Sequence, residues 1–114
     1  MENCLFCKIA NKEINSEIIY ENDKVLVFKD INPQAPVHLL LIPKKHISSI
    51  VEIEEFGSDE ITELFKAISK ISKDFELDKS GFRIVINTGA SAGQSVNHLH
   101  FHILGKRNFN WPPG

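Results

Sequence analysis

A chain of 114 residues is long enough for one compact domain and too short for two, so we expect a single domain over residues 1–114. The apolar fraction of 42% and the charged fraction of 25% are ordinary for a globular protein and argue against a disordered or collagen-like chain. A formal net charge of −2, with lysines spread along the chain, offers no basic surface for nucleic-acid phosphates.

Targeting and membrane signals are also missing from the sequence. No apolar run approaches the roughly 20 residues that a membrane-spanning helix needs. The N-terminus carries neither the basic segment nor the apolar segment of a secretory signal. We therefore expect a cytoplasmic protein that binds neither membranes nor nucleic acids.

The chain begins with a closely spaced cysteine pair. Cys4 and Cys7 have the spacing of half a zinc site, and His38, His46 or the later histidines can supply further ligands. A disulfide here would close a trivial loop, so two reduced cytosolic thiols are the competing interpretation. The pair by itself leaves both interpretations open.

Three short β-rich runs follow, over residues 18–21, 24–31 and 38–43. Turn-forming residues separate them, so the runs are expected to be consecutive antiparallel strands. Asp30 lies at the end of the second run. Its carboxylate can bind a ribose diol, or it can simply start the Asn-Pro turn that comes next.

Residues 58–76 are predicted to form one long amphipathic helix. Apolar side chains recur there at intervals of three and four, and Asp59 and Glu60 lie in the first turn, where they oppose the helix dipole. Two further strands are predicted over residues 82–87 and 98–104. The pattern indicates an antiparallel α+β domain.

Histidines alternate with apolar residues along residues 98–104. Successive side chains of a strand point to opposite faces, so His98, His100 and His102 are expected on one face, roughly 6.6 Å apart, with the apolar residues on the other. One alternative is an ordinary half-exposed strand. Another is a metal site, because two histidines at this spacing can ligate one ion.

The small-residue loop over residues 89–95 precedes these histidines. Glycines let backbone N–H groups approach an anion, and Ser95 adds a hydroxyl donor. Such a loop is often a plain turn, but its position beside three histidines favours a phosphate-binding loop. Asn87, at the end of the preceding strand, is a second candidate for contacts with a nucleotide.

Together these residues resemble one known family. Residues 98–104 (HLHFHIL) match the motif of the histidine triad (HIT) superfamily at every position. Residues 28–38, 42–47, 93–96 and the C-terminal Trp-Pro-Pro-Gly at 111–114 resemble its Hint branch, the purine nucleoside phosphoramidases. The resemblance extends over essentially the whole chain.

The resemblance implies a HIT-like α+β fold. Its features are a five-stranded antiparallel sheet, one long helix and a short N-terminal helix. It also implies a homodimer in which two subunits join their sheets into one continuous sheet. Trp111 would then lie near the pocket of the other subunit.

The implied activity is cleavage of the P–N bond in purine nucleoside phosphoramidates, such as conjugates of AMP or GMP. It proceeds through a covalent nucleotidyl-histidine and releases a nucleoside monophosphate. A dinucleoside polyphosphate hydrolase of the same superfamily is the nearest alternative. A nucleotide-binding interaction module comes from a different functional class, and a zinc hydrolase is a further one.

Site residues carried over by the resemblance fall into three groups. The catalytic group contains His100 as nucleophile, His102, His38 and Ser95. The nucleotide-binding group contains Leu5, Phe6, Ile9, Phe28, Asp30, Ile31, Asn87, Gly93, Gln94 and Val96. The group that would hold a structural zinc ion contains Cys4, Cys7, His46 and His98.

Three positions depart from the family pattern. Lys29 replaces a frequent histidine, Ala92 a frequent glycine and Asn97 a frequent tyrosine. These differences bear on substrate preference more than on the chemistry.

Overall fold

The structure is a computed structural model that describes residues 3–114. The helices are α1 (Leu5–Ala10), α2 (Ser58–Asp74) and α3 (Leu77–Ser80), with 3-10 helices η1 (Ile50–Glu55) and η2 (Ala90–Ala92). The strands are β1 (Ile18–Glu21), β2 (Val25–Lys29), β3 (Val37–Pro43), β4 (Phe82–Val85) and β5 (Phe101–Gly105). None of the helices described is long and apolar enough to cross a membrane.

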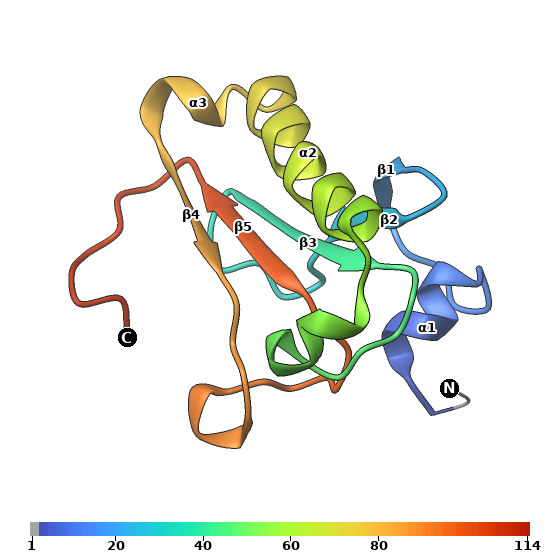
Figure 1. The fold of residues 1–114 in the computed structure, drawn as a ribbon. Helices are drawn as coiled ribbons and strands as arrows, with labels where there is room; N and C mark the ends of the chain where they lie inside the picture. The colour runs from blue at the N-terminus through green and yellow to red at the C-terminus, as the bar shows by residue number, and fades with distance from the viewer. Residues whose placement is uncertain (1–2) are drawn as a thin grey trace.

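The strands form one antiparallel sheet in the order β1-β2-β3-β5-β4. Figure 1 shows this sheet with α2 lying across one face. The central strand β3 pairs with β2 and β5, and β4 occupies an outer edge. The expected α+β fold with five antiparallel strands and a short N-terminal helix is confirmed.

Helix α2 covers one face of the sheet because its apolar side chains share one side. Leu64, Ala67 and Ile71 are buried against Val27 of β2 and Phe101 of β5. Burying a leucine or isoleucine side chain contributes about 2 kcal/mol, so this layer is a large part of the hydrophobic core. At the helix start, Glu60 accepts a hydrogen bond from the Gly57 amide at 2.6 Å and caps the first turn.

The opposite face is covered near β2 and β3 by α1. Phe6 and Ile9 of this helix pack with Leu26, Phe28 and Leu40 in a second apolar cluster. Strands β2 and β3 are therefore buried on both faces, which explains why they read as nearly continuous apolar runs. The second cluster also places α1 beside the histidine-bearing segment, because the ring of Phe6 lies 5.0 Å from that of His100.

The last strand is shorter than predicted at its start. We expected residues 98–104, but β5 begins at Phe101, so His98 and His100 precede the strand. Its pairing with β3 ends at Leu41 and Phe101. Beyond that point Pro43 has no N–H to donate, and its carbonyl instead accepts a hydrogen bond from His98 Nε2 at 2.8 Å.

The predicted alternation of faces nevertheless holds. Leu99, Phe101 and Ile103 lie in the core under α2. His98 and His100 lie instead against Phe6 of α1.

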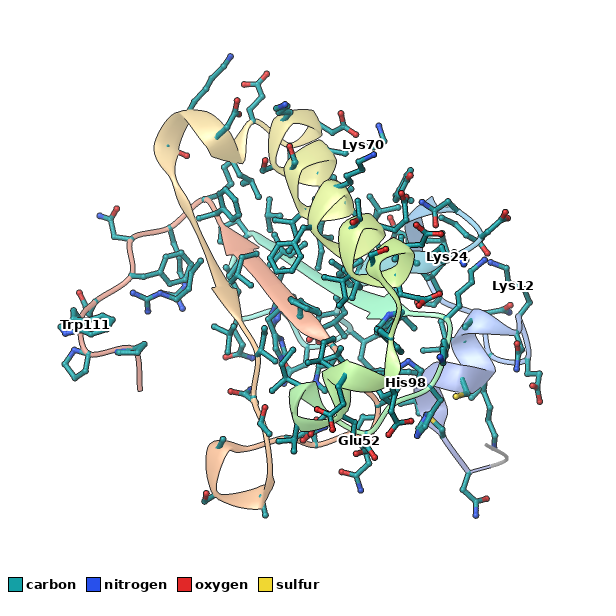
Figure 2. The ribbon with its side chains drawn as sticks, in the orientation of Figure 1. Lys12, Lys24, Glu52, Lys70, His98 and Trp111 are labelled. Carbon is teal, nitrogen blue, oxygen red and sulfur yellow. The ribbon has the colours of Figure 1, made fainter. Side chains whose placement is uncertain are left out.

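The other boundaries differ from the predictions by one or two residues. Helix α2 ends at Asp74 rather than 76, since Glu76 adopts a left-handed backbone conformation with φ 57°. The short helices η1, η2 and α3 were not predicted. After β5 the chain leaves the sheet as an extended C-terminal tail (Figure 1), and Figure 2 shows Trp111 on this tail, far from the sheet.

Candidate functional site

His100 is the candidate nucleophile, and its ring is held in one tautomer. Its Nδ1 lies 2.7 Å from the carbonyl oxygen of His98. A carbonyl can only accept, so Nδ1 carries the proton and donates, which leaves a lone pair on Nε2. The residue is only 3% exposed. The ring is thus fixed and its free nitrogen is in the form that can attack an electrophile.

Next to His100 lies a chain of hydrogen bonds that ends at His102. The backbone N–H of Gln34 donates to His38 Nδ1 at 2.9 Å, so the proton of neutral His38 is on Nε2. That nitrogen lies 2.9 Å from His102 Nδ1 and 3.4 Å from the Asp30 carboxylate. His102 therefore accepts at Nδ1 and keeps its own proton on Nε2, where it can act as a donor.

Burial keeps both histidines of this hydrogen-bond chain, His38 and His102, neutral. Burial lowers the pKa of His38, against the opposing effect of the Asp30 carboxylate. Burial, with smaller contributions from His100 and His38, lowers the pKa of His102 to about 4. The tautomers assigned above are therefore those present at neutral pH.

Asp30, His38 and His102 also lie close enough together to be considered as metal ligands. The backbone N–H of Gln34 argues against a metal site here. It occupies Nδ1 of His38 and so keeps a proton on Nε2, the nitrogen that faces the other two side chains. A metal there would need that proton removed, which makes a hydrogen-bond chain the better description.

The Asp30 carboxylate has two different surroundings. One oxygen accepts the Asn32 N–H at 2.8 Å, so this residue does start the following turn. The other oxygen faces His38. Sequence considerations offered the turn and a functional role as alternatives, and the structure confirms the turn while leaving one oxygen beside the histidines.

A second cluster of possible ligands joins α1 to the histidine segment. In it the Nδ1 atoms of His46 and His98 face the sulfur atoms of Cys4 and Cys7, and all four ligand atoms lie within 4.8 Å of one another. Cys7 Sγ is 3.3 Å from His46 Nδ1 and 3.5 Å from His98 Nδ1. Figure 2 shows His98 at the end of the molecule where α1 lies.

The protonation pattern of this cluster suits a metal. His98 donates its Nε2 proton to the Pro43 carbonyl, so its Nδ1 lone pair faces the thiols. Burial lowers the pKa of His98 to about 4, which keeps the ring neutral. Burial and the neighbouring Cys4 raise the pKa of the Cys7 thiol to about 11, and a bound cation would oppose this by favouring the thiolate. Two sulfurs and two imidazoles fit a tetrahedral zinc ion.

The small-residue loop lies close to this cluster. Gly89 and Gly93 have φ values of 84° and 86°, which other residues rarely adopt, so glycine is required at both positions. Ser95 and Val96, together with Leu5 of α1, line an open cleft of about 670 Å³ that also reaches Cys4 and His46. The loop therefore borders a space large enough for part of a ligand.

Several predicted nucleotide-binding residues are also brought together. Phe6, Ile9 and Phe28 are buried in one apolar cluster. Asn87 lies two residues beyond the end of β4, whose pairing with β5 ends at Val85 and His102. Ile31 is different, because its side chain is 100% exposed.

Comparisons with known proteins agree with this geometry. A model of the HIT domain matches residues 11–109. The chain belongs to the HIT family. A 14 kDa zinc-binding protein of Brassica juncea is 48% identical over 112 residues, which cover 96% of this chain and 98% of that protein.

Solved structures of the HIT family show the same fold. A HIT family hydrolase from Legionella pneumophila Philadelphia 1 is 44% identical, with a TM-score of 0.94 and coverage of 98% of this chain and 100% of that chain. A histidine triad nucleotide-binding protein from Candida albicans is 31% identical, with a TM-score of 0.85 and coverage of 98% and 85%. The resemblance noted in the sequence is thus confirmed at the level of family and fold.

Three residues that shape this HIT-family site were not among the sequence candidates. Gln34 sets the tautomer of His38 through its amide, and Pro43 sets that of His98 through its carbonyl. Arg107 holds Gln34 in turn, since its Nε donates to the Gln34 carbonyl at 2.9 Å. Gln34 and Pro43 act through backbone atoms rather than side chains, so no pattern of side chains could have revealed them.

Proposed function

We propose that this HIT-family protein is a hydrolase that cleaves the P–N bond of purine nucleoside phosphoramidates and releases a nucleoside monophosphate. The observation that carries the proposal is the tautomer of His100. Its Nδ1 proton is engaged by the His98 carbonyl, and its Nε2 makes no hydrogen bond to residues 3–114. A neutral, oriented imidazole is the form that attacks phosphorus.

In the proposed reaction a bond forms between His100 Nε2 and the α-phosphorus, and the P–N bond breaks. The departing amine needs a proton, and the Nε2–H of His102 is the nearest donor that the hydrogen-bond chain supplies. Water then attacks the nucleotidyl-histidine, the bond between phosphorus and His100 Nε2 breaks, and the proton lost by the water passes to His102 Nε2, so that both histidines return to their starting states. Ser95 and the amides of the loop would stabilise negative charge on the phosphoryl oxygens.

Binding of the nucleotide would use the residues that flank these groups. We assign the base to the exposed apolar border formed by Leu5 and Ile31, which the buried side chains of Phe6, Ile9 and Phe28 would support from the core. Asp30 would hold the ribose hydroxyls. The phosphate would be contacted by Asn87, Gly93 and Val96.

We further propose that Cys4, Cys7, His46 and His98 hold a structural zinc ion. Two arguments support this assignment: the donor set described above, and the name of the Brassica juncea relative. The ion would tie α1 to the histidine segment. The carbonyl of His98 orients the ring of His100, so an ion bound to His98 would help to position the nucleophile without taking part in the reaction.

A homodimer of single HIT domains, located in the cytoplasm, completes the proposal. Supporting features are the outer edge of β4, the 60% exposed Phe65 on α2, and the 84% exposed Trp111 on the tail. Among residues 3–114, β4 pairs only with β5, and such a strand edge together with exposed apolar side chains is suited to contacts with a second copy.

The test is turnover of an adenosine phosphoramidate by the wild type and by His100→Ala. We expect the substitution to abolish turnover while AMP binding persists, because the base and ribose contacts remain. Mass spectrometry of a wild-type reaction that is quenched without acid should show a nucleotidyl adduct on His100. Faster cleavage of a dinucleoside polyphosphate than of the phosphoramidate would assign the protein to the other hydrolase branch, and near-normal turnover by His100→Ala would refute the mechanism.

A further inference from the structure

The side chain of Gln94 is fully occupied by the backbone around it. Its Oε1 accepts the Gly89 N–H at 2.9 Å. Its Nε2 donates to the carbonyls of Ser48 at 2.7 Å and Val96 at 3.0 Å. Both amide hydrogens are thus used, and no donor remains for a ligand. Gln94 therefore links the two ends of the small-residue loop over residues 89–95, which we call the phosphate-binding loop, and connects them to Ser48.

Ser48 belongs to a short connection that holds three parts of the site. This anchor segment, residues 46–48, begins with His46 in the thiol and imidazole cluster. The carbonyl of Ile47 accepts the Leu99 N–H at 2.9 Å and so holds the histidine segment. The carbonyl of Ser48 holds Gln94. The position of the loop relative to the histidines therefore depends on where the anchor segment lies.

Glu52 fixes the end of the anchor segment. Its Oε1 accepts both the backbone N–H of Ser48 at 2.7 Å and the Ser48 hydroxyl at 2.6 Å. These bonds lower the pKa of Glu52, so the side chain is a carboxylate and both bonds are charge-assisted. Figure 2 shows Glu52 on the short helix near the end of the molecule that carries His98.

We infer that Glu52 is a positioning residue for the phosphate-binding loop, acting through Ser48 and Gln94. The inference rests on the proposed function insofar as the loop is taken to contact the transferred phosphoryl group. It also changes the role of Gln94, which acts from behind the loop through three backbone contacts rather than as a ligand. Ser95 is the adjacent residue, and it lines the cleft.

Kinetics of matched variants provide the first test. Glu52→Ala should lower kcat for an adenosine phosphoramidate about tenfold and change KM less than about twofold, because misplacement of a charge-stabilising loop affects the transition state most. Glu52→Gln keeps an acceptor oxygen and should restore most of the loss. Glu54→Ala is the control, since Glu54 lies on the same short helix, is exposed, and makes no side-chain bond within residues 3–114.

A double variant tests the route. If Glu52 acts through Gln94, adding Glu52→Ala to Gln94→Ala should lower kcat no further than Gln94→Ala alone. Fully additive losses would overturn the route, because the two residues would then act independently.

Hydrogen exchange provides a readout that does not depend on catalysis. In Glu52→Ala the Gly89 amide should exchange about tenfold faster, while the Leu99 amide, held by Ile47, should keep its protection. Equal acceleration at both amides would indicate general destabilisation and overturn the inference. So would wild-type exchange at Gly89 together with wild-type kcat. Faster Gly89 exchange in a protein without phosphoramidase activity would support the positioning role and count against the proposed function alone.

Discussion

Two histidine clusters lie on the same side of the sheet, and they differ in whether the ring nitrogen that faces the other cluster members carries a proton. In the cluster of Cys4, Cys7, His46 and His98, the Pro43 carbonyl accepts a hydrogen bond from Nε2 of His98, so the lone pair on Nδ1 faces the sulfurs. In the cluster of Asp30, His38 and His102, the Gln34 amide donates to His38 and leaves a proton facing its neighbours.

The comparison shows that side-chain type and proximity do not by themselves distinguish a metal site from a hydrogen-bond chain. Each cluster brings its ligand atoms within 4.8 Å of one another. A backbone acceptor behind a histidine prepares it to bind a cation, whereas a backbone donor behind it prepares it to donate a proton.

The largest expected effect concerns the zinc ion that we propose for the first cluster. Cys7→Ser should lose bound zinc and lower Tm by about 10 °C or more, because a ligand that binds only the folded state contributes several kcal/mol to its stability. Asp30→Asn is the matched control in the second cluster and should keep one zinc per chain. Elemental analysis and thermal unfolding measure both. Zinc loss in Asp30→Asn, or zinc retained in Cys7→Ser, would break the distinction between the clusters.

A smaller effect concerns the pH dependence of stability through His102. Its pKa is lowered from 6.5 to about 4 by burial, so between these values the unfolded chain binds the proton and the folded chain does not. Stability should therefore fall as the pH drops from 6.5 toward 4, by at most about 1.4 kcal/mol per pH unit for this residue.

Urea unfolding at several pH values can isolate this contribution. His102→Asn cannot take up the proton, so its free energy of unfolding should fall less steeply with decreasing pH than that of the wild type. Parallel pH profiles for the two proteins would show that His102 is not held neutral by the fold.

The smallest expected effect is on the far end of the hydrogen-bond chain. Arg107→Ala removes the donor to the Gln34 carbonyl, so the Gln34 amide should hold the tautomer of His38 less firmly. We expect kcat to fall about threefold to tenfold with little change in zinc content, because the contact acts only indirectly. Lys106→Ala, on the neighbouring exposed position, should behave as wild type. Zinc loss in Arg107→Ala would mean that the two clusters are not independent.

Much of this architecture was predictable because it follows from local rules. The spacing of apolar residues predicted α2, and the alternation along residues 98–104 predicted which side chains face the core. The start of β5 was not predictable in the same way. It depends on Pro43, a distant residue that cannot extend the pairing and whose carbonyl captures His98 instead.

The sequence by itself determined the antiparallel α+β pattern, because local periodicity is a property of short segments, and the family, because the resemblance to HIT proteins extends over nearly the whole chain. Only the tertiary structure decided which nitrogen of each histidine is protonated and which loop residue is free to meet a ligand. Those properties depend on backbone donors and acceptors such as Gln34, Pro43 and Ser48, which are remote in sequence from the groups that they orient and carry no signal in their side chains.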